Sequence, residues 1–331
     1  MVSADPLTRS TVALVFSGGL GLASYHAGVH QAFAEAGLPL DWVAGSSSGA
    51  VTAAIIAGTG AEARQVGLRS FWNMAGRPRA EQHPWRHLQG WMNAVRTHLV
   101  GAPGQFHPRI PAMDTLSFRS LYDLTPMRER LNALIDFGRL NSGEIRISVA
   151  ATDVETGDPV IFDSARHVIA MDHLLASCGF LPEFAPVEIA GRMLVDGGFS
   201  VNAPFDAILA EDTPRGLRLF VIDLYARDGY RPRTLEGAAE RKNDLLFGNQ
   251  TYLRLKDQLA LRRCRRPECR DETFLLSYRS GAAEPGPEKS FNFSDAAIAE
   301  RWNAGFLDMQ AALTESRPEV GGIRTIRRNT A

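Results

Sequence analysis

The chain has 331 residues, of which 45% are hydrophobic and 22% are charged, an ordinary balance for a globular protein with a large core. Its formal net charge of −1 gives no overall attraction to nucleic acid, so we expect no nucleic-acid partner. Cys178, Cys264 and Cys269 are too few for a disulfide framework, and no second Cys/His pair completes a zinc site. We therefore expect reduced thiols, no metal and no cofactor.

The sequence carries no recognisable signal for export or for membrane insertion. The apolar run at residues 12–16 is too short for the core of a signal peptide. No stretch approaches the roughly 18 consecutive apolar residues that span a bilayer. We expect a cytoplasmic protein, and export by a system that reads no cleavable signal stays open.

Short apolar runs that end in glycine turns alternate with helical patterns early in the chain. Residues 11–16 and 40–44 are predicted as buried strands, and residues 24–36 and 49–57 as helices. This alternation predicts an α/β fold with a mainly parallel sheet covered on both faces. Later strands are predicted at 145–151, 160–162, 193–195, 217–222 and 274–278.

We expect one domain with an extension. Residues 11–226 form the predicted catalytic domain, with a helical insertion at about 60–140. Residues 227–331 form a mostly helical C-terminal extension packed on the same domain, with helices predicted at 235–266 and 294–313.

Gly45-Ser46-Ser47-Ser48-Gly49 follows a predicted strand and opens a helix of small residues. This is the context of a nucleophile elbow, in which a tight turn projects the middle serine over the helix N-terminus. Gly45 and Gly49 fix the register, which makes Ser47 the candidate nucleophile. The competing interpretation is a small-residue turn that only packs a helix on a sheet.

Ser17-Gly18-Gly19-Leu20-Gly21 ends the first predicted strand, and its backbone N–H groups could hold an anion. Ser24 stands where a dinucleotide-binding loop needs its third glycine, and the Gly-Lys-Ser/Thr of a P-loop is missing. Upstream of a nucleophile elbow, the loop is therefore interpreted as an oxyanion hole.

The residues alone leave more than one candidate for the general base. All eight histidines precede Asp196, so an order that places histidine after this acid cannot be built. One triad order survives, in which Ser47 is followed by Asp153 and then by His167 or His173. Asp196-Gly197-Gly198 reads equally well as a base beside a close-approach loop and as a hairpin turn.

Three motifs together resemble the patatin-like phospholipases: the glycine loop from Ser17 to Gly28, Gly45-Ser-Ser-Ser-Gly49, and Asp196-Gly-Gly198. Ala151-Thr-Asp153 and Leu181-Pro-Glu-Phe-Ala-Pro186 are similar to further family signatures. The resemblance covers about residues 11–226. Beyond it, Phe291-Asn-Phe-Ser294 and Glu300-Arg-Trp-Asn-Ala-Gly305 look like the C-terminal extension of a bacterial branch of the family.

The resemblance implies a three-layer α/β/α sandwich and a catalytic dyad without histidine. Ser47 would attack a lipid acyl ester and form an acyl-enzyme, and Asp196 would accept its proton. The N–H groups around Gly18, Gly19 and Leu20 would form the oxyanion hole, with Gly21, Gly197 and Gly198 in supporting positions. The chain departs from the family at Leu20, where the family has a third glycine.

Other functions remain open from the sequence. A member of this fold with a distorted oxyanion loop would be a non-catalytic module that binds a lipid or a partner. The same dyad would also serve acyl transfer to an alcohol. The basic stretch at residues 254–270 is typical either of a helix that contacts an anionic membrane peripherally or of a solvated helix face.

Overall fold

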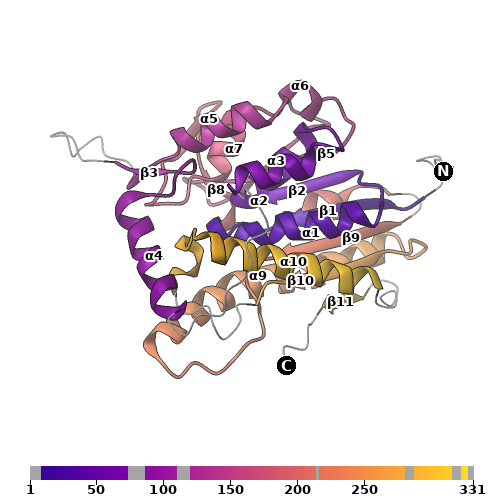
Figure 1. Ribbon diagram of the computed structural model, residues 1–331. Helices are drawn as coiled ribbons and strands as arrows, with labels where there is room; N and C mark the ends of the chain where they lie inside the picture. The colour runs from indigo at the N-terminus through magenta and orange to yellow at the C-terminus, as the bar shows by residue number, and fades with distance from the viewer. Residues whose placement is uncertain are drawn as a thin grey trace.

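The computed structural model describes residues 9–73, 86–109, 120–213, 216–279, 287–314 and 322–326, so parts of the predicted insertion and extension lie outside it. Its centre is a nine-stranded sheet in the order β11-β10-β9-β1-β2-β5-β8-β7, with β6 paired to β5 (Figure 1). The strands of this sheet are β1 (Thr11–Phe16), β2 (Trp42–Ser46), β5 (Arg146–Asp153), β6 (Pro159–Asp163), β7 (Val187–Ile189), β8 (Arg192–Asp196), β9 (Leu217–Asp223), β10 (Glu272–Ser277) and β11 (Ile323–Ile326). A separate two-stranded sheet pairs β3 (His107–Pro108) antiparallel with β4 (Tyr122–Asp123).

The sheet is parallel from β11 to β5, whereas β6, β8 and β7 run antiparallel to their neighbours. The carboxyl ends of β1, β2 and β9 therefore meet at one edge, where open α/β sheets place their ligands. The strands near the centre are buried on both faces, which explains why they read as continuous apolar runs.

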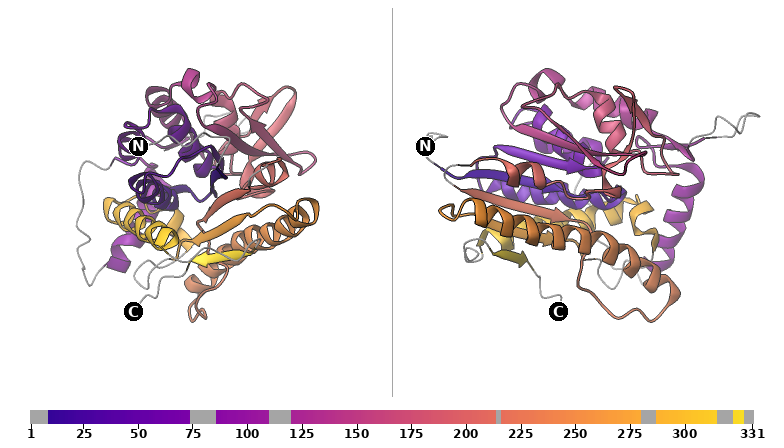
Figure 2. Two further views of the ribbon diagram at one scale, coloured as in Figure 1. Left: turned by 90° about the vertical axis from the view of Figure 1, so that its right-hand side faces the viewer. Right: turned by 180° about the vertical axis from the view of Figure 1, so that it is seen from behind.

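Helices cover both faces of the sheet and make the predicted three-layer α/β/α sandwich, which is confirmed. Leu14 and Phe16 of β1 belong to a core shared with one helical layer, and Ala13 and Val15 to a core shared with the other. The first layer holds α1 (Ser24–Glu35), α2 (Ser48–Gly58), α3 (Arg64–Phe71) and α10 (Asp295–Thr314); the second holds α8 (Asp206–Ala210) and α9 (Leu235–Arg265) (Figure 2).

The remaining helices lie around the carboxyl ends of the parallel strands or beside the antiparallel strands. Helix α4 stands at the end of the molecule opposite the N-terminus (Figure 1). These elements are η2 (Leu20–Ala23), α4 (Arg86–Val100), α5 (Thr125–Leu134), α6 (Phe137–Leu140), α7 (Met171–Ser177), η3 (Gly197–Phe199) and η4 (Pro287–Phe291).

The C-terminal third is built into the sheet as well as packed on it. Strands β10 and β11 extend the parallel sheet beyond β9, so the boundary drawn at residue 226 falls between neighbouring strands of one sheet. The predicted helices at 235–266 and 294–313 are confirmed as α9 and α10. The short strand β11 carries no sequence pattern that predicted it.

Candidate active site

Ser47 occupies a strained turn between β2 and α2. Its φ of 55° and ψ of −128° lie outside the regions that serine normally adopts. The two flanking glycines are required by contact: a Cβ on Gly45 would lie 2.3 Å from the carbonyl oxygen of Gly49, and one on Gly49 would lie 2.2 Å from that of Phe16. The turn has the geometry of a nucleophile elbow.

A hydrogen bond from a separate element holds this turn. The Ser47 N–H donates to Ser177 Oγ at 2.8 Å, and Ser177 Oγ donates to the Ala150 carbonyl at 2.5 Å. Ser177 is the last residue of α7, so this helix is tied to the nucleophile turn and to β5. The first turn of α2 contains no acidic residue, which leaves the positive end of the helix dipole at Ser47 uncompensated.

The register of the sheet places Asp196 beside the Ser47 turn. Ser46 pairs with Ala150 of β5, and Ala151 pairs with Asp196 of β8, so the acid lies level with the turn on the far side of one strand. Gly197 packs directly on this arrangement, because a Cβ there would lie 2.5 Å from both Ser46 Oγ and the Ala150 carbonyl. The sheet thus brings Ser47 and Asp196 together, and Gly197 makes the close approach possible.

The Asp196 carboxyl group is buried, and one of its two oxygens lacks a hydrogen-bond partner among the described residues. Its Oδ1 accepts a hydrogen bond from Gly198 N–H at 2.7 Å, and its Oδ2 has no hydrogen-bond partner among the described residues. Burial raises the pKa of Asp196 to about 7, against the opposing influence of the Ser47 hydroxyl and of Gly198 N–H. The Ser47 hydroxyl is thus close enough to favour the carboxylate, although the pair does not form a hydrogen bond of normal geometry in this conformation.

The glycine loop wraps beside Ser47. A Cβ on Gly18 would lie 2.9 Å from Ser47 Cβ, so the loop backbone lies directly beside Ser47. The N–H of Gly18 donates to Asn202 Oδ1 at 3.0 Å, and that of Gly19 donates to Ser48 Oγ at 3.1 Å. Two of the three residues predicted to supply donors are therefore already engaged.

Leu20 and Gly21 begin η2, and neither N–H donates to a described group. Leu20 adopts a φ of 51°, the left-handed conformation that glycine takes without strain. Leu20 thus takes a backbone conformation that glycine would favour, and it lines the pocket beside Ser47.

The residues of the alternative triad make other contacts. Asp153 forms an ion pair with Arg192 at 2.7 Å and accepts the N–H groups of Glu155 and Thr156. His173 Nδ1 accepts Ala170 N–H at 2.9 Å at the start of its own helix, and its ring lies against Phe162. His167 also packs on Phe162 and lies near Asp163 N. None of these contacts joins Asp153 to a histidine or a histidine to Ser47.

A small apolar cavity of about 40 Å³ opens beside Ser47. It is lined by Leu20, Ser47, Ser48, Val51, Phe71, Trp72, Gln105, Phe106, Leu124, Met127, Cys178, Phe184 and Phe293. Burial, with the Asp196 charge as a smaller cause, holds the pKa of the Cys178 thiol well above its usual value, so Cys178 is an inert part of the wall.

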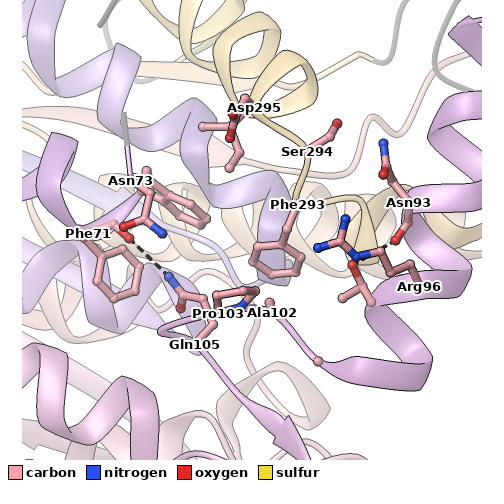
Figure 3. Close-up of a pocket in the computed structure, with 14 residues that line it drawn as sticks. Phe71, Asn73, Asn93, Arg96, Ala102, Pro103, Gln105, Phe293, Ser294 and Asp295 are labelled. Atoms are coloured by element: carbon pink, nitrogen blue, oxygen red, sulfur yellow. Dashed lines mark hydrogen bonds between the residues drawn. The ribbon is translucent and has the colours of Figure 1, made fainter. Parts of the chain in front are cut away.

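A second cavity of about 380 Å³ adjoins the first. The two cavities share Phe71, Trp72, Gln105 and Phe293 as lining residues. Figure 3 shows the Phe293 ring between the loop that carries Gln105 and the helix that carries Arg96. Gln105 Nε2 donates to the Phe71 carbonyl at 3.2 Å, which ties two parts of this wall together.

Several contributors to the site have no sequence signal of their own. Ser177 lies in an ordinary helix end, and Asn202 differs from other polar loop residues only through its contact with Gly18. Phe293 comes from the C-terminal extension, where it belongs to the family-like Phe291-Asn-Phe-Ser294 motif, but nothing in that motif places it at the site. Such residues are recognisable only when the fold places them beside Ser47.

The basic stretch at residues 254–270 lies on α9 and the loop after it, and part of it is neutralised within the protein. Arg254 pairs with Asp206, Arg262 with Asp271, and Arg266 with Asp212 and Glu268. These pairs favour the solvated-helix interpretation, and peripheral membrane contact stays a prediction. Within the described ranges, no helix is both long and apolar enough to cross a membrane, and no group of three or more His, Cys, Asp or Glu is placed to hold a metal ion.

Comparison with known proteins identifies the family. A family model described as patatin-like phospholipase matches residues 14–209, more than half of the 331-residue chain. The comparison with curated protein sequences found no significant match.

Three solved structures are similar over most of this chain. VipD from Legionella pneumophila is 12% identical with a TM-score of 0.42, covering 91% of this chain and 66% of its own. ExoU in its complex with SpcU from Pseudomonas aeruginosa is 16% identical (TM-score 0.30; 78% and 58% covered), and the type III effector ExoU is 15% identical (0.29; 91% and 54%). This chain therefore spans less than two thirds of the length of those proteins. On the family match, the chain belongs to the patatin-like phospholipases, a family of lipid hydrolases.

Proposed function

We propose that this chain hydrolyses carboxylic esters of lipids, as a phospholipase A, lysophospholipase or carboxylesterase, through a Ser47–Asp196 dyad. The observation that carries the proposal is the pairing of a strained Ser47 at the head of α2 with a buried acid whose pKa is raised to about 7. A carboxylate with this pKa is a stronger base than an ordinary aspartate near neutral pH, which suits it to take a serine proton.

The reaction follows from these two side chains. Ser47 Oγ attacks the ester carbonyl carbon while its proton passes to Asp196 Oδ2, the oxygen with no other described partner. Collapse of the tetrahedral intermediate breaks the bond to the alcohol, which leaves with the proton from Asp196. Water then attacks the acyl-enzyme, gives a proton to Asp196, and releases the fatty acid as the proton returns to Ser47.

The developing oxyanion needs donors that are free in the resting protein. The N–H groups of Leu20 and Gly21 meet this condition, and the Gly19 N–H would have to leave Ser48 Oγ first. A single well-placed donor is worth about 10²–10³ in turnover, or roughly 3 kcal/mol. We therefore assign the hole to the beginning of η2, with Leu20 as its main donor.

The experiment that tests the proposal combines covalent labelling with turnover. A fluorophosphonate probe and a series of p-nitrophenyl acyl esters are applied to the wild type, Ser47→Ala, Asp196→Asn and His173→Ala. Ser70→Ala, an exposed serine on α3, is the matched control for loss of a hydroxyl. We expect labelling and turnover to be lost in the first two variants and retained in the last two.

The other outcomes point to different functions. Loss of activity in His173→Ala to the level of Ser47→Ala would replace the dyad with a triad. A folded wild type that neither labels nor turns over any ester would favour a non-catalytic binding module, for which the engaged N–H groups of Gly18 and Gly19 are the supporting observation.

A further inference from the structure

The oxyanion loop is held from two directions. On its near side, Asn202 and Ser48 bind the N–H groups of Gly18 and Gly19. On its far side, the carbonyl oxygen of Gly21 accepts a hydrogen bond of 3.0 Å from Nη1 of Arg301, a residue 280 positions later in the chain. The end of the loop is thus held by the C-terminal extension.

Arg301 lies in α10 and is completely buried, with an exposed fraction of 0%. Its guanidinium also donates to the carbonyl of Asn292 at 2.8 Å and to that of Lys289 at 2.7 Å. Burying a cation costs several kcal/mol unless its donors are satisfied, and an apolar side chain would fill this space without that cost. Nη1 and Nη2 of the guanidinium meet this need in part through the three carbonyls, which they join into one unit.

The loop and the extension are also in direct contact at Gly21. A Cβ on Gly21 would lie 2.9 Å from the Ser290 carbonyl oxygen and 3.2 Å from the Phe293 ring. Only glycine leaves room here for η4 and the residues after it to pack against the loop. The Phe291-Asn-Phe-Ser294 motif of the sequence is the segment that makes this contact.

The backbone of α10 around Arg301 is also held in place. Helices α1 and α10 pack backbone to backbone: a Cβ on Gly28 would lie 1.8 Å from the Trp302 carbonyl oxygen, and one on Gly305 would lie 2.1 Å from that of Tyr25. Tyr25 Oη donates to Asp308 Oδ2 at 2.7 Å across the same contact. Because α1 follows η2 directly, α10 cannot shift relative to the loop without breaking this packing.

These contacts act on a backbone that would otherwise move. Leu20 holds an unfavourable φ of 51°, and Gly21 has the widest conformational freedom of any residue type. A bond to the Gly21 carbonyl fixes the rotation of the Gly21–Leu22 peptide and so stabilises the turn that presents the Leu20 and Gly21 N–H groups. Donors that are fixed before the reaction stabilise an oxyanion far better than donors that must reorganise.

We propose that Arg301 is a positioning residue for the oxyanion loop, and that the C-terminal extension thereby forms part of the catalytic apparatus. The inference rests on the proposed esterase function for its kinetic consequence. Its structural content, that the guanidinium immobilises residues 18–23, is independent of that function and can be measured separately.

The test compares Arg301→Met and Arg301→Lys with Arg262→Met. Arg262, on α9 in the opposite helical layer, is the matched control. It is also buried, and it also binds two backbone carbonyls, those of Leu209 and Glu211. We expect Arg301→Met to lower kcat and the fluorophosphonate labelling rate by about 10²-fold with KM changed less than about threefold, since the oxyanion forms only in the transition state. Arg301→Lys should recover part of this loss, and Arg262→Met should lose stability without this kinetic signature.

A second variant and hydrogen–deuterium exchange test the same role of Arg301 independently. If Arg301→Met does not fold, Gly21→Ala pushes the loop away from Ser290 and Phe293 with Arg301 in place, and should reproduce the loss in kcat. Hydrogen–deuterium exchange of residues 18–23 should accelerate in Arg301→Met or in Gly21→Ala but not in Arg262→Met, whether or not the wild type hydrolyses esters. Unchanged exchange in the loop, or a folded Arg301→Met with kcat within twofold of the wild type, would overturn the proposal. An inactive wild type with faster loop exchange in the variant would instead remove the proposed function alone.

Discussion

The backbone N–H of Ser47, the proposed nucleophile, donates a hydrogen bond of 2.8 Å to the hydroxyl of Ser177. The same hydroxyl donates to the Ala150 carbonyl on β5, so Ser177 ties the strained turn to the sheet. Backbone strain of this kind costs about 1–3 kcal/mol and persists only where surrounding contacts enforce it. Ser177 is one of those contacts.

Ser177→Ala should therefore weaken both the fold and the reaction. It leaves the N–H of Ser47 and the carbonyl of Ala150 buried without this partner, at a cost of about 1–3 kcal/mol in the free energy of unfolding. The turn can then relax, and we expect kcat to fall at least about tenfold. Urea unfolding and ester turnover measure the two effects, with Ser70→Ala as the control. Equal turnover in the two variants would contradict the role given to Ser177.

The raised pKa of Asp196 predicts a specific dependence of activity on pH. In the proposed dyad, Asp196 must be ionised to accept the Ser47 proton, and burial raises its pKa to about 7. We expect kcat/KM to rise with pH to a plateau above 7, with a tenfold loss for each pH unit below it. A profile already flat between pH 5 and 7 would show that Asp196 is ionised throughout and that burial does not control the base.

The same shift has the opposite consequence for stability. Asp196 in the folded state holds its proton up to a pKa of about 7, against 3.8 in the unfolded chain, so the folded state binds more protons between these values. Its contribution to stability is complete below pH 4 and is lost as pH rises through 7. Asp196→Asn should therefore raise the melting temperature relative to the wild type at pH 8 and leave it nearly unchanged at pH 4. Asp223, whose pKa burial also raises to about 7, should give the wild type a residual dependence of the same sign.

The parts of the site that the sequence predicted are those whose physical requirement is local. Gly45 and Gly49 are four residues apart and contact each other, so their spacing in the sequence is enough to predict the turn. The parallel strands were recognisable because burial on both faces leaves a continuous apolar run. The fold class and the position of Ser47 in a strand–turn–helix unit followed from such short-range patterns.

The other parts depend on contacts between distant segments. The residues of Asp196-Gly197 fit a base and a hairpin turn equally well, and the sheet register is what places Gly197 against Ser46 and Ala150. The bond between Arg301 and Gly21 spans 280 positions and follows no periodicity. Engagement of the Gly18 N–H by Asn202 likewise results from the way two loops meet. No local pattern encodes these relationships, and the resemblance to a family decided between the two equal interpretations of Asp196.

Two buried ion pairs join η4 to α9 within the C-terminal extension. Lys289 Nζ in η4 lies 3.2 Å from Glu240 Oε1 and 3.0 Å from Asp244 Oδ1 on α9, and all three side chains are nearly inaccessible to solvent. Lys289→Met removes the cation that the two buried acids share, while Arg241 stays 3.9 Å from Asp244 Oδ2. The variant should lower the free energy of unfolding near neutral pH by up to about 3–5 kcal/mol.

This deficit should itself depend on pH. Burial raises the pKa of Asp244, and Lys289 opposes the rise, so removing the lysine raises this pKa further. An acid with a raised pKa contributes stability at low pH that is lost as pH increases. Lys289→Met should therefore be less damaging at pH 5 than at pH 8 in urea unfolding, and the triple variant with Glu240→Gln and Asp244→Asn should recover much of the loss. An equal deficit at both pH values would mean that lost packing, and not uncompensated charge, dominates.

The wall between the two cavities predicts the preferred acyl length. The cavity beside Ser47 holds about 40 Å³, whereas the adjoining one holds about 380 Å³, and Phe293 lines both. Its ring stacks on Trp72 with centroids 6.4 Å apart, which closes the wall from the side of the C-terminal extension. The wild type should therefore favour short acyl chains.

Phe293→Ala should join the cavities and shift the preference toward longer chains. Each methylene that gains a buried position is worth about 0.8 kcal/mol, so three of them change kcat/KM by more than about tenfold. The measurement is the ratio of kcat/KM for p-nitrophenyl dodecanoate to that for the butyrate, which cancels any general loss caused by the contact of Phe293 with Gly21. Asn93→Ala is the control, because Asn93 lines only the larger cavity. An unchanged ratio in Phe293→Ala, or the same shift in Asn93→Ala, would contradict this prediction. The acyl chain would then bind elsewhere, and Phe293 would not limit its length.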